Sequence, residues 1–498
     1  MRQAISVQPT LDCPSPIQVQ LNLNCRDEII PILRALQHIY SDPSLLQPIM
    51  TLIGRDVNPT TSKKHGRPGL GYWEILVLAA VHLGCNLDYD KLQNLAEEHR
   101  SLRQMMGIGA WEELQKPQDR KKFDWRNIRD NVCWLRPETL KKINDAVVAA
   151  GHILAPDAIE QVRGDTFVVE TNIHYPTDSS LIEDGLRKVL KLSAVMAKEY
   201  EVAGWRQYEH WHQTVRKQVR KISRAAKSKK GDKDQRLEKG YRELLGTAKD
   251  LLERATALLL QVAVLTGSVL DELKASAQQD ELKKYLELTR QVCGNARRRV
   301  LAGETVPNAE KIFSIFEPHT ELIKRDKQPN PLQFGHNVLV IEDAAGFICH
   351  YEVVKNGVQD VELVVPVMKK LQKRFDNKIE RASFDRGFHS AENQIELGKI
   401  VTHPCLAAKG SKKGPEQQEN ASVEFCESRQ RHPGVESAIG ALQAGNGLER
   451  CRDHSQRGYE RYVGLGILGR NLHVLGKLLI RADAKESQAG KSKRKKTA

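Results

Sequence analysis

The sequence predicts an α/β layer fold, in which a mixed sheet is flanked by helices, with an all-helical N-terminal domain and a long helical insertion. Short β-branched runs occur at residues 165–170, 336–354 and 378–385, and helix-like patterns lie between the last two. Strands interleaved with helices are typical of such layered folds. No strand-like run lies between Ser180 and Ala302. We therefore expect one α/β core interrupted by helices.

The first 150 residues are expected to form helices that bind DNA. Residues 75–83 are dense in apolar side chains, and from Tyr89 to His99 apolar residues recur at helical spacing. Gly84 and Asn86 separate the two segments, so a helix-turn-helix arrangement fits. Helical hairpins that do not touch DNA are more common, and that alternative stays open.

Patterns of apolar, turn-forming and helix-capping residues also predict the elements and domain boundaries of the rest of the chain. Asp165 to Glu170 is expected as a strand, and the apolar runs on either side of Asp343–Gly346 predict a hairpin. Ser390 is expected to cap a helix, and Glu436 to lie in the first turn of another. The expected divisions are a helical N-terminal domain (1–150), a first strand region (151–180), a helical basic insertion (181–328), the remainder of the core (329–482) and a basic disordered tail (483–498).

The net charge of +14 and the pI of about 9.2 indicate a polyanionic partner, although many basic proteins simply have basic surfaces. From Arg216 to Arg242 there are twelve Lys and Arg against three Asp and Glu. A run of this kind is most often a solvated helical face. In a basic protein it can equally follow a phosphate backbone.

Cysteine usage and hydropathy indicate a protein of the cytosol. The nine cysteines are scattered singly without a C-x-x-C pair, as expected of reduced thiols. The N-terminus does not resemble a signal peptide. No apolar run approaches about 20 residues, so we expect no segment to span a membrane.

Asp385 stands at the end of an apolar run in "IERASFDRGFHSAEN". A solvated turn would explain it, and so would a metal ligand at a strand end. Phosphoryl transfer by two Mg²⁺ ions about 3.5–4 Å apart uses several carboxylates from separate elements. The pattern alone cannot select such a set from the 63 acidic residues.

Four segments resemble those of DDE-type bacterial insertion-sequence transposases, in particular the group of insertion sequences not classified yet. They are "GDTFVVETNIHYPTDSSLIEDGLR", "EKIFSIFEPHTELIK", "FDRGFHSAEN" and "RHPGVESAIGALQAGNGLERCRDHSQRGYERYVGLGILGRNL". The resemblance runs from about Trp73 to about Leu479. It implies an RNase H-like catalytic core that binds two Mg²⁺ ions, with Mn²⁺ as an alternative. It also implies that Asp165, Asp385 and Glu436 are the catalytic and metal-binding acids.

Related enzymes often place Tyr, Arg and Lys at fixed offsets around the third acid, where this chain has Arg429, His432 and Gln443. The lysine equivalent is therefore absent. Arg429, Arg431 and His432 are the expected substitutes as phosphate contacts. The other expected DNA contacts are Arg386, His389, Lys217, Arg220, Lys221 and Arg224.

The resemblance implies a DNA transposase that hydrolyses a phosphodiester at the transposon end and transfers the freed 3′-OH into target DNA. Its expected partners are transposon-end DNA, target DNA and a second copy of the chain, within a bacterial cytoplasm at the nucleoid. Two alternatives stay open: an RNase H-like nuclease that does not join DNA, and a catalytically inactive DNA-binding derivative.

Overall fold

The computed structural model describes residues 12–57, 69–109, 111, 115–116, 118, 120–265, 269–325, 331–408 and 422–496. Contacts between residues divide the chain into two compact units. Unit 1 comprises Met1–Thr171 and Gly335–Ala498, and unit 2 comprises Asn172–Phe334. Each unit has its own hydrophobic core.

The fold is mixed α/β, with a mixed sheet of seven strands among the described residues. β3 runs antiparallel to β1 and to β4, whereas β5 is parallel to β1 and β6 is parallel to β5. The main order is β2-β3-β1-β5-β6; β4 also pairs with β3, and β7 with β1. The strands are β1 (Gln161–Thr171), β2 (Glu321–Lys324), β3 (Leu332–Asp343), β4 (Ile348–Val353), β5 (Arg381–Phe384), β6 (His403–Leu406) and β7 (Arg450–Cys451).

The predicted hairpin joins β3 to β4. Asp343 is buried, and its Oδ1 accepts hydrogen bonds from the backbone N–H groups of Ala345 and Phe347, each at 3.0 Å. Gly346 has a φ of 91°, a region that favours glycine. His152 lies 2.7 Å from the other carboxylate oxygen of Asp343. Asp343 therefore holds the turn together.

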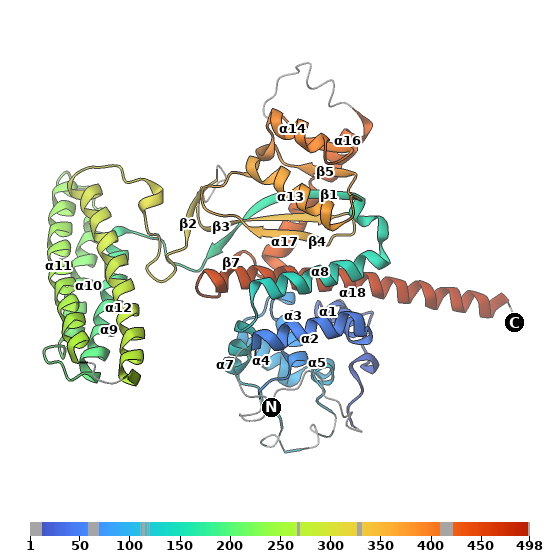
Figure 1. Ribbon diagram of the computed structural model, residues 1–498, viewed down its shortest axis with the longest axis horizontal. Coiled ribbons are helices and arrows are strands. Elements are labelled where there is room, and N and C mark those ends of the chain that lie inside the picture. Colours follow the sequence, from blue (N-terminus) through green and yellow to red (C-terminus); the bar gives the residue numbers. More distant parts are fainter. Residues whose placement is uncertain are drawn as a thin grey trace. The chain divides into compact units, whose positions relative to one another are not determined.

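Helices flank the sheet in unit 1, and α8 and α18 both contact β4 (Figure 1). The longer helices of unit 1 begin and end with the expected signals, such as Pro137 at the start of α8 and the Ser390 hydroxyl capping α14. They are α1 (Ile29–Ser41), α2 (Pro43–Val57), α3 (Tyr72–Gly84), α4 (Tyr89–Glu98), α5 (Arg100–Met105), α7 (Trp125–Cys133), α8 (Pro137–Leu154), α13 (Asp360–Arg374), α14 (Ala391–Gly398), α16 (Val423–Arg431), α17 (Gly434–Gly445) and α18 (Gln456–Lys496).

The N-terminal helices share one hydrophobic core with the sheet. α18 packs against α1, α3 and α8, and the buried residues of all four helices belong to the same cluster as those of β1 and β3. The sequence predicted a boundary after residue 150, where its pattern changes from helix to strand. The structure differs because the last helix of the chain fills the space between the first helices.

α18 is longer than the sequence predicted. The expected helix ended near Arg481 and the tail 483–498 was expected to be disordered, but the helix continues to Lys496. This tail is rich in Lys and Ala, which favour helix. By length and composition its Gln456–Glu486 part could also span a membrane, with a mean hydropathy of 1.3, but 72% of that apolar window is buried inside the protein. Packing against α1, α3 and α8 accounts for this apolar character.

Unit 2 is helical apart from β2 and the start of β3. Its long helices lie side by side around their own core (Figure 1). Unit 2 begins at Asn172 and ends at Phe334, so it is slightly longer at both ends than the predicted insertion of 181–328. The long helices are α9 (Asp178–Glu199), α10 (Tyr208–Ala226), α11 (Lys233–Leu265) and α12 (Val269–Ala296).

Candidate active site

Asp165 and Asp385 follow paired residues of two neighbouring parallel strands. Gly164 of β1 lies opposite Phe384 of β5, and Asp165 and Asp385 are the next residues of the two strands. Asp385 has an extended backbone, with φ −70° and ψ 166°, so the strand direction continues through it. Because parallel strands run in the same direction, Asp165 and Asp385 lie level with one another at the point where β5 ends.

Both carboxylates face the same side of the sheet. Side chains alternate between the two faces along a strand, so Asp165 faces the side of Arg163, and Asp385 that of Ser383. Arg163 Nη1 donates to the backbone oxygen of Arg431 at 2.9 Å, and Ser383 Oγ lies 3.2 Å from His432 Nδ1. Both contacts are to the turn between α16 and α17, so this turn covers the face on which the two carboxylates lie.

Glu436 lies in the first turn of α17, which packs against β1. The buried imidazole of His432 connects this turn with the acids. Burial lowers the pKa of His432, whereas the negative charges of Asp385 and, more weakly, Glu436 raise it. Two of the three predicted acids therefore act on one imidazole, and the third lies level with Asp385. The structure places all three on adjoining elements of unit 1.

Carboxylate oxygens are ligands that divalent metals such as Mg²⁺ prefer, but the three acids do not form a preformed metal site. Asp385 and Glu436 are exposed and Asp165 is half-buried, so their oxygen atoms face a solvent-accessible edge. No group of three or more His, Cys, Asp or Glu side chains in the described part of the chain is close enough to hold a metal ion. Mg²⁺ usually takes only one or two protein carboxylates and completes its shell with water and substrate phosphates. The described residues therefore form no preformed metal site, and Mg²⁺ binding by these acids stays a prediction.

The basic residues expected near the acids differ in exposure. Arg386 is exposed and forms no ion pair with any residue that the structure describes, while His389 is half-buried. Arg431 is exposed, and its Nη1 donates to Gln161 Oε1 at 2.7 Å. Arg429 is half-buried, with its Nη1 atom buried and unpartnered among the described residues. Arg386 and Arg431 therefore remain accessible to a phosphate.

His432 does not fit the predicted role of a DNA contact. Its exposed fraction is 7%, and its Nδ1 faces the Ser383 hydroxyl. The buried imidazole therefore packs between the α16–α17 turn and the face of the sheet that carries the acids. The sequence prediction made it a phosphate contact because it stands at one of the offsets from the third acid where related enzymes carry such contacts.

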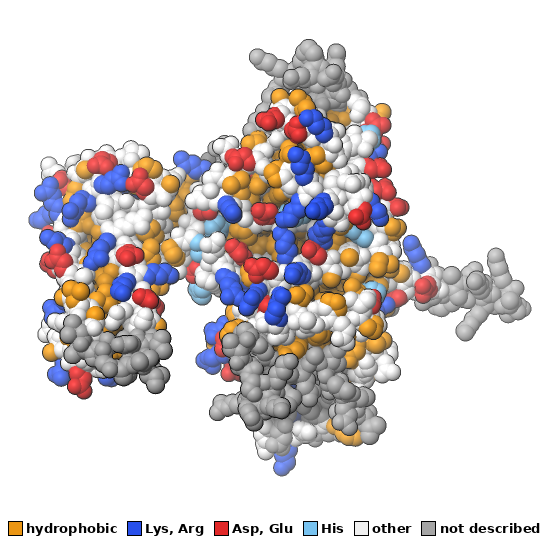
Figure 2. Space-filling model, in the orientation of Figure 1, with side chains coloured by type: hydrophobic (Ala, Val, Ile, Leu, Met, Phe, Trp, Pro, Cys, Tyr) orange, Lys and Arg blue, Asp and Glu red, His pale blue; other side chains and the backbone are white. Residues whose placement is uncertain are grey.

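The predicted DNA contacts of the insertion lie on α10 in unit 2. Lys217, Arg220, Lys221 and Arg224 are all exposed, as the helical spacing predicts. Lys and Arg are interspersed with Asp and Glu over the visible faces of both units (Figure 2). The net charge of the protein is therefore not concentrated in one block of that view.

We compared the chain with protein-family models, with curated proteins and with solved structures. No family model, curated protein or solved structure matches it.

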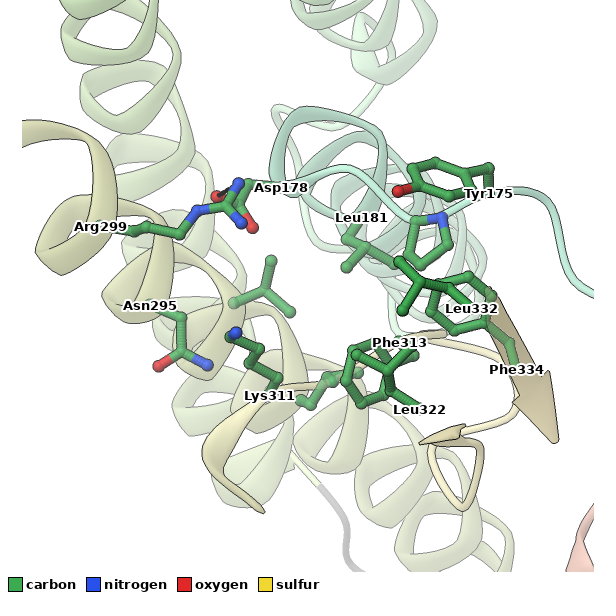
Figure 3. A pocket seen from close by; sticks show the side chains of 13 residues that line it. Tyr175, Asp178, Leu181, Asn295, Arg299, Lys311, Phe313, Leu322, Leu332 and Phe334 are labelled. Atoms are coloured by element: carbon green, nitrogen blue, oxygen red, sulfur yellow. Dashed lines mark ion pairs between the residues drawn. The ribbon is translucent and has the colours of Figure 1, made fainter. Parts of the chain in front are cut away.

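The other acids near the predicted motifs have structural partners. Glu170 lies 2.9 Å from Arg450, and Asp343 is held in the hairpin described above. Asp178 lines a pocket of unit 2, where it pairs with Arg299 at 2.7 Å (Figure 3). Burial raises the pKa of Asp178, and Arg299 opposes that shift. These acids therefore belong to other parts of the fold.

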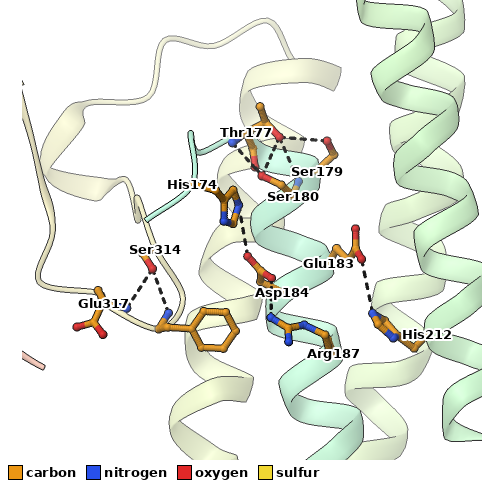
Figure 4. Close-up of polar contacts among 11 residues, drawn as sticks. His174, Thr177, Ser179, Ser180, Glu183, Asp184, Arg187, His212, Ser314 and Glu317 are labelled. Atoms are coloured by element: carbon orange, nitrogen blue, oxygen red, sulfur yellow. Dashed lines mark hydrogen bonds and ion pairs between the residues drawn. The ribbon is translucent and has the colours of Figure 1, made fainter. Parts of the chain in front are cut away.

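The "TNIHYPTDSS" block runs from the last residue of β1 to the first residues of α9. Thr177 and Ser180 make a reciprocal cap, with Thr177 Oγ1 accepting from the Ser180 backbone N–H at 3.2 Å. His174 lies 3.5 Å from Asp184, which also pairs with Arg187 at 3.0 Å (Figure 4). The block therefore connects β1 to the first long helix of unit 2.

Two residues beside the acids were not predicted. Arg163 pairs with the buried Glu342 at 2.6 Å while it contacts the α16–α17 turn, so it ties that turn to β1 and β3. Asp360, at the start of α13, accepts from Thr166 Oγ1 at 3.2 Å. Because Thr166 alternates with Asp165, Asp360 lies on the opposite face of β1. The sequence did offer a signal for Arg163, because a residue two positions before Asp165 in a strand lies on the same face as Asp165.

Gly434 is the position where the α16–α17 turn meets Arg163. A Cβ atom at residue 434 would lie 2.0 Å from Arg163 Nη1. We expect Gly434→Ala to displace this guanidinium from the buried Glu342 and to lower the free energy of unfolding by about 1–3 kcal/mol. Urea denaturation measures this change.

Gly440→Ala on the same helix is the matched control. A Cβ atom at residue 440 would meet nothing within 4 Å, so alanine there should leave stability unchanged or raise it by up to about 1 kcal/mol. Equal stability of the two variants would show that Arg163 does not fix the turn.

Proposed function

We propose that the protein is a DNA transposase with an RNase H-like core, and that Asp165, Asp385 and Glu436 form its catalytic centre. The observation that supports this most strongly is the register of β1 and β5. It brings acids 220 positions apart in the sequence to adjacent positions on one face, beside the helix that carries the third acid. Three acids picked at random from the chain would not be expected to lie on adjoining elements in this way.

The chemistry assigned to the site is phosphoryl transfer. A divalent metal held by one or two of these carboxylates together with substrate phosphates would supply Lewis-acid stabilisation and lower the pKa of an attacking water. Asp165 is held within β1, Asp385 directly follows β5, and Glu436 adds a third carboxylate from α17. Arg386 and Arg431 lie near the acids in the sequence and are exposed, so they can neutralise phosphates of the bound strand.

Two successive displacements at phosphorus are proposed. In the first, a water oxygen bonds to phosphorus at the transposon end and the 3′-oxygen leaves as a hydroxyl. In the second, that 3′-OH bonds to a target phosphorus, and the target's own 3′-oxygen leaves. Each step exchanges one P–O bond for another, so neither an external energy source nor a covalent link to the protein is needed. Two copies of the chain would act together, because a transposon has two ends.

A strand-transfer assay tests this function. The substrate is a pre-cut duplex that carries the inverted repeat bracketing the protein's own gene, mixed with a supercoiled plasmid in Mg²⁺ or Mn²⁺. We expect joined products that disappear on addition of EDTA.

The same assay separates the alternatives. Cutting of an uncut end without any joined product would indicate an RNase H-like nuclease. Binding of the duplex with neither cutting nor joining in either metal would indicate an inactive DNA-binding derivative.

A further inference from the structure

A groove of about 700 Å³ lies in unit 2 between the end of α10 and the beginning of α11. The two helices pack against one another, and the short turn that joins them closes one end of their hairpin (Figure 1). Six basic side chains and one carboxylate line the groove. They are Lys221, Arg224, Lys227, Lys230, Arg236 and Lys239, with Glu243.

Most of this positive charge has no partner within the protein. Lys221 lies 3.8 Å from Glu243, and Arg236 pairs with Asp232 at 2.8 Å. The other four basic residues form no ion pair with any part of the chain that the structure describes. All six are exposed. Separations within a groove of this size are comparable to the screening length of about 8 Å at physiological salt, so the charges repel one another.

Helix dipoles explain only part of the cluster. The negative C-terminal end of α10 favours cations such as Arg224. The positive N-terminal end of α11 disfavours them, yet Lys233, Arg236 and Lys239 all lie in its first two turns. A solvated helical face would not require cations at that end. An external polyanion in the groove would relieve the unfavourable charge of both Arg236 and Lys239.

We propose that this groove binds the sugar–phosphate backbone of a nucleic acid without reading its sequence. The lining has no aromatic side chain on which a base could stack and no large apolar side chain that could enter a bilayer. Lysines outnumber arginines, and lysine contacts phosphate as a point charge rather than in a paired geometry. None of the proposed catalytic acids is among the residues that line the groove, so this binding does not depend on the proposed transposition chemistry.

Salt dependence of DNA binding tests the proposal in the full chain. The groove variant is Lys227→Gln, Lys230→Gln and Lys239→Gln together, and the probe is a fluorescent duplex of random sequence. The slope of log affinity against log salt concentration is negative, and each lost phosphate contact makes it shallower by about 0.9. The triple variant should therefore make the slope shallower by about 2–3. Anisotropy titrations at several NaCl concentrations measure the slope.

The control variant removes the same charge elsewhere on unit 2, through Lys191→Gln, Lys198→Gln and Lys284→Gln. These lysines are exposed, lie outside the groove and form no ion pair among the described residues. The control should retain the wild-type slope. An equal change of slope in both variants would show that only the net charge matters, and it would overturn the proposal. An unchanged slope in the groove variant would also overturn it.

Two further measurements complete the test. If the triple variant does not fold by circular dichroism, Lys227→Gln alone should make the slope shallower by about 0.9. A polyglutamate peptide that binds the wild type and loses affinity in the groove variant, while the duplex does not, would instead assign the groove to an acidic protein. Strand transfer and the salt slope are measured on the same wild-type protein, so a groove-dependent slope without strand transfer would leave this proposal intact while contradicting the proposed function.

Discussion

Asp385→Asn is expected to lower the rate of DNA cleavage by about 10³-fold or more and to leave DNA affinity unchanged or slightly raised. The amide keeps the shape of the side chain but removes the negative charge that a divalent metal requires. Metal catalysis contributes several kcal/mol, and each 1.36 kcal/mol corresponds to a tenfold change in rate. Affinity does not fall because a carboxylate beside DNA phosphates is repelled by them. Single-turnover cleavage and a binding titration on the same duplex measure both quantities.

Asp376→Asn provides the matched control for this substitution. Asp376 is exposed in unit 1 beyond the end of α13, and its φ of 51° is a region that asparagine adopts readily. The control should cleave at the wild-type rate. Wild-type cleavage by the Asp385 variant would exclude the proposed catalytic centre.

Gly476→Ala is expected to destabilise unit 1 by about 3 kcal/mol, near the upper end of the usual cost of overpacking. A Cβ atom at residue 476 would lie 1.8 Å from the backbone oxygen of Pro31. Backbone atoms cannot rotate away as a side chain can, so α18 and α1 would have to separate. The midpoint of urea unfolding measures this loss.

Gly440→Ala again serves as the control, since it adds the same methyl group where nothing lies within 4 Å. If the two variants unfold at the same urea concentration, the close approach of α18 to α1 does not limit stability.

The sequence predicted those parts of the fold that depend on local patterns. The hairpin at Asp343–Gly346, the cap at Ser390 and the place of Glu436 in a first helical turn are all confirmed. Each depends on turn, capping or dipole preferences of neighbouring residues. The common core of the N-terminal helices and the sheet was not predicted, because it depends on contacts between opposite ends of the chain.

The candidate site could be predicted only through resemblance. Acidic residues at a strand end and in a helix's first turn are common, so spacing could not select Asp165, Asp385 and Glu436. Arg163 and the burial of His432 were missed because both depend on how the α16–α17 turn packs on the sheet. That packing is not visible in any local run of residues.

The position of α18 has a consequence for biosynthesis. The apolar residues of α1, α3 and α8 are covered by a helix that the ribosome makes after all three. Until residues 456–480 have emerged, the nascent chain must carry that surface uncovered. At a synthesis rate of about 5–20 residues per second, this exposure lasts for roughly 20 seconds or more in a chain of this length, long enough for a chaperone to bind.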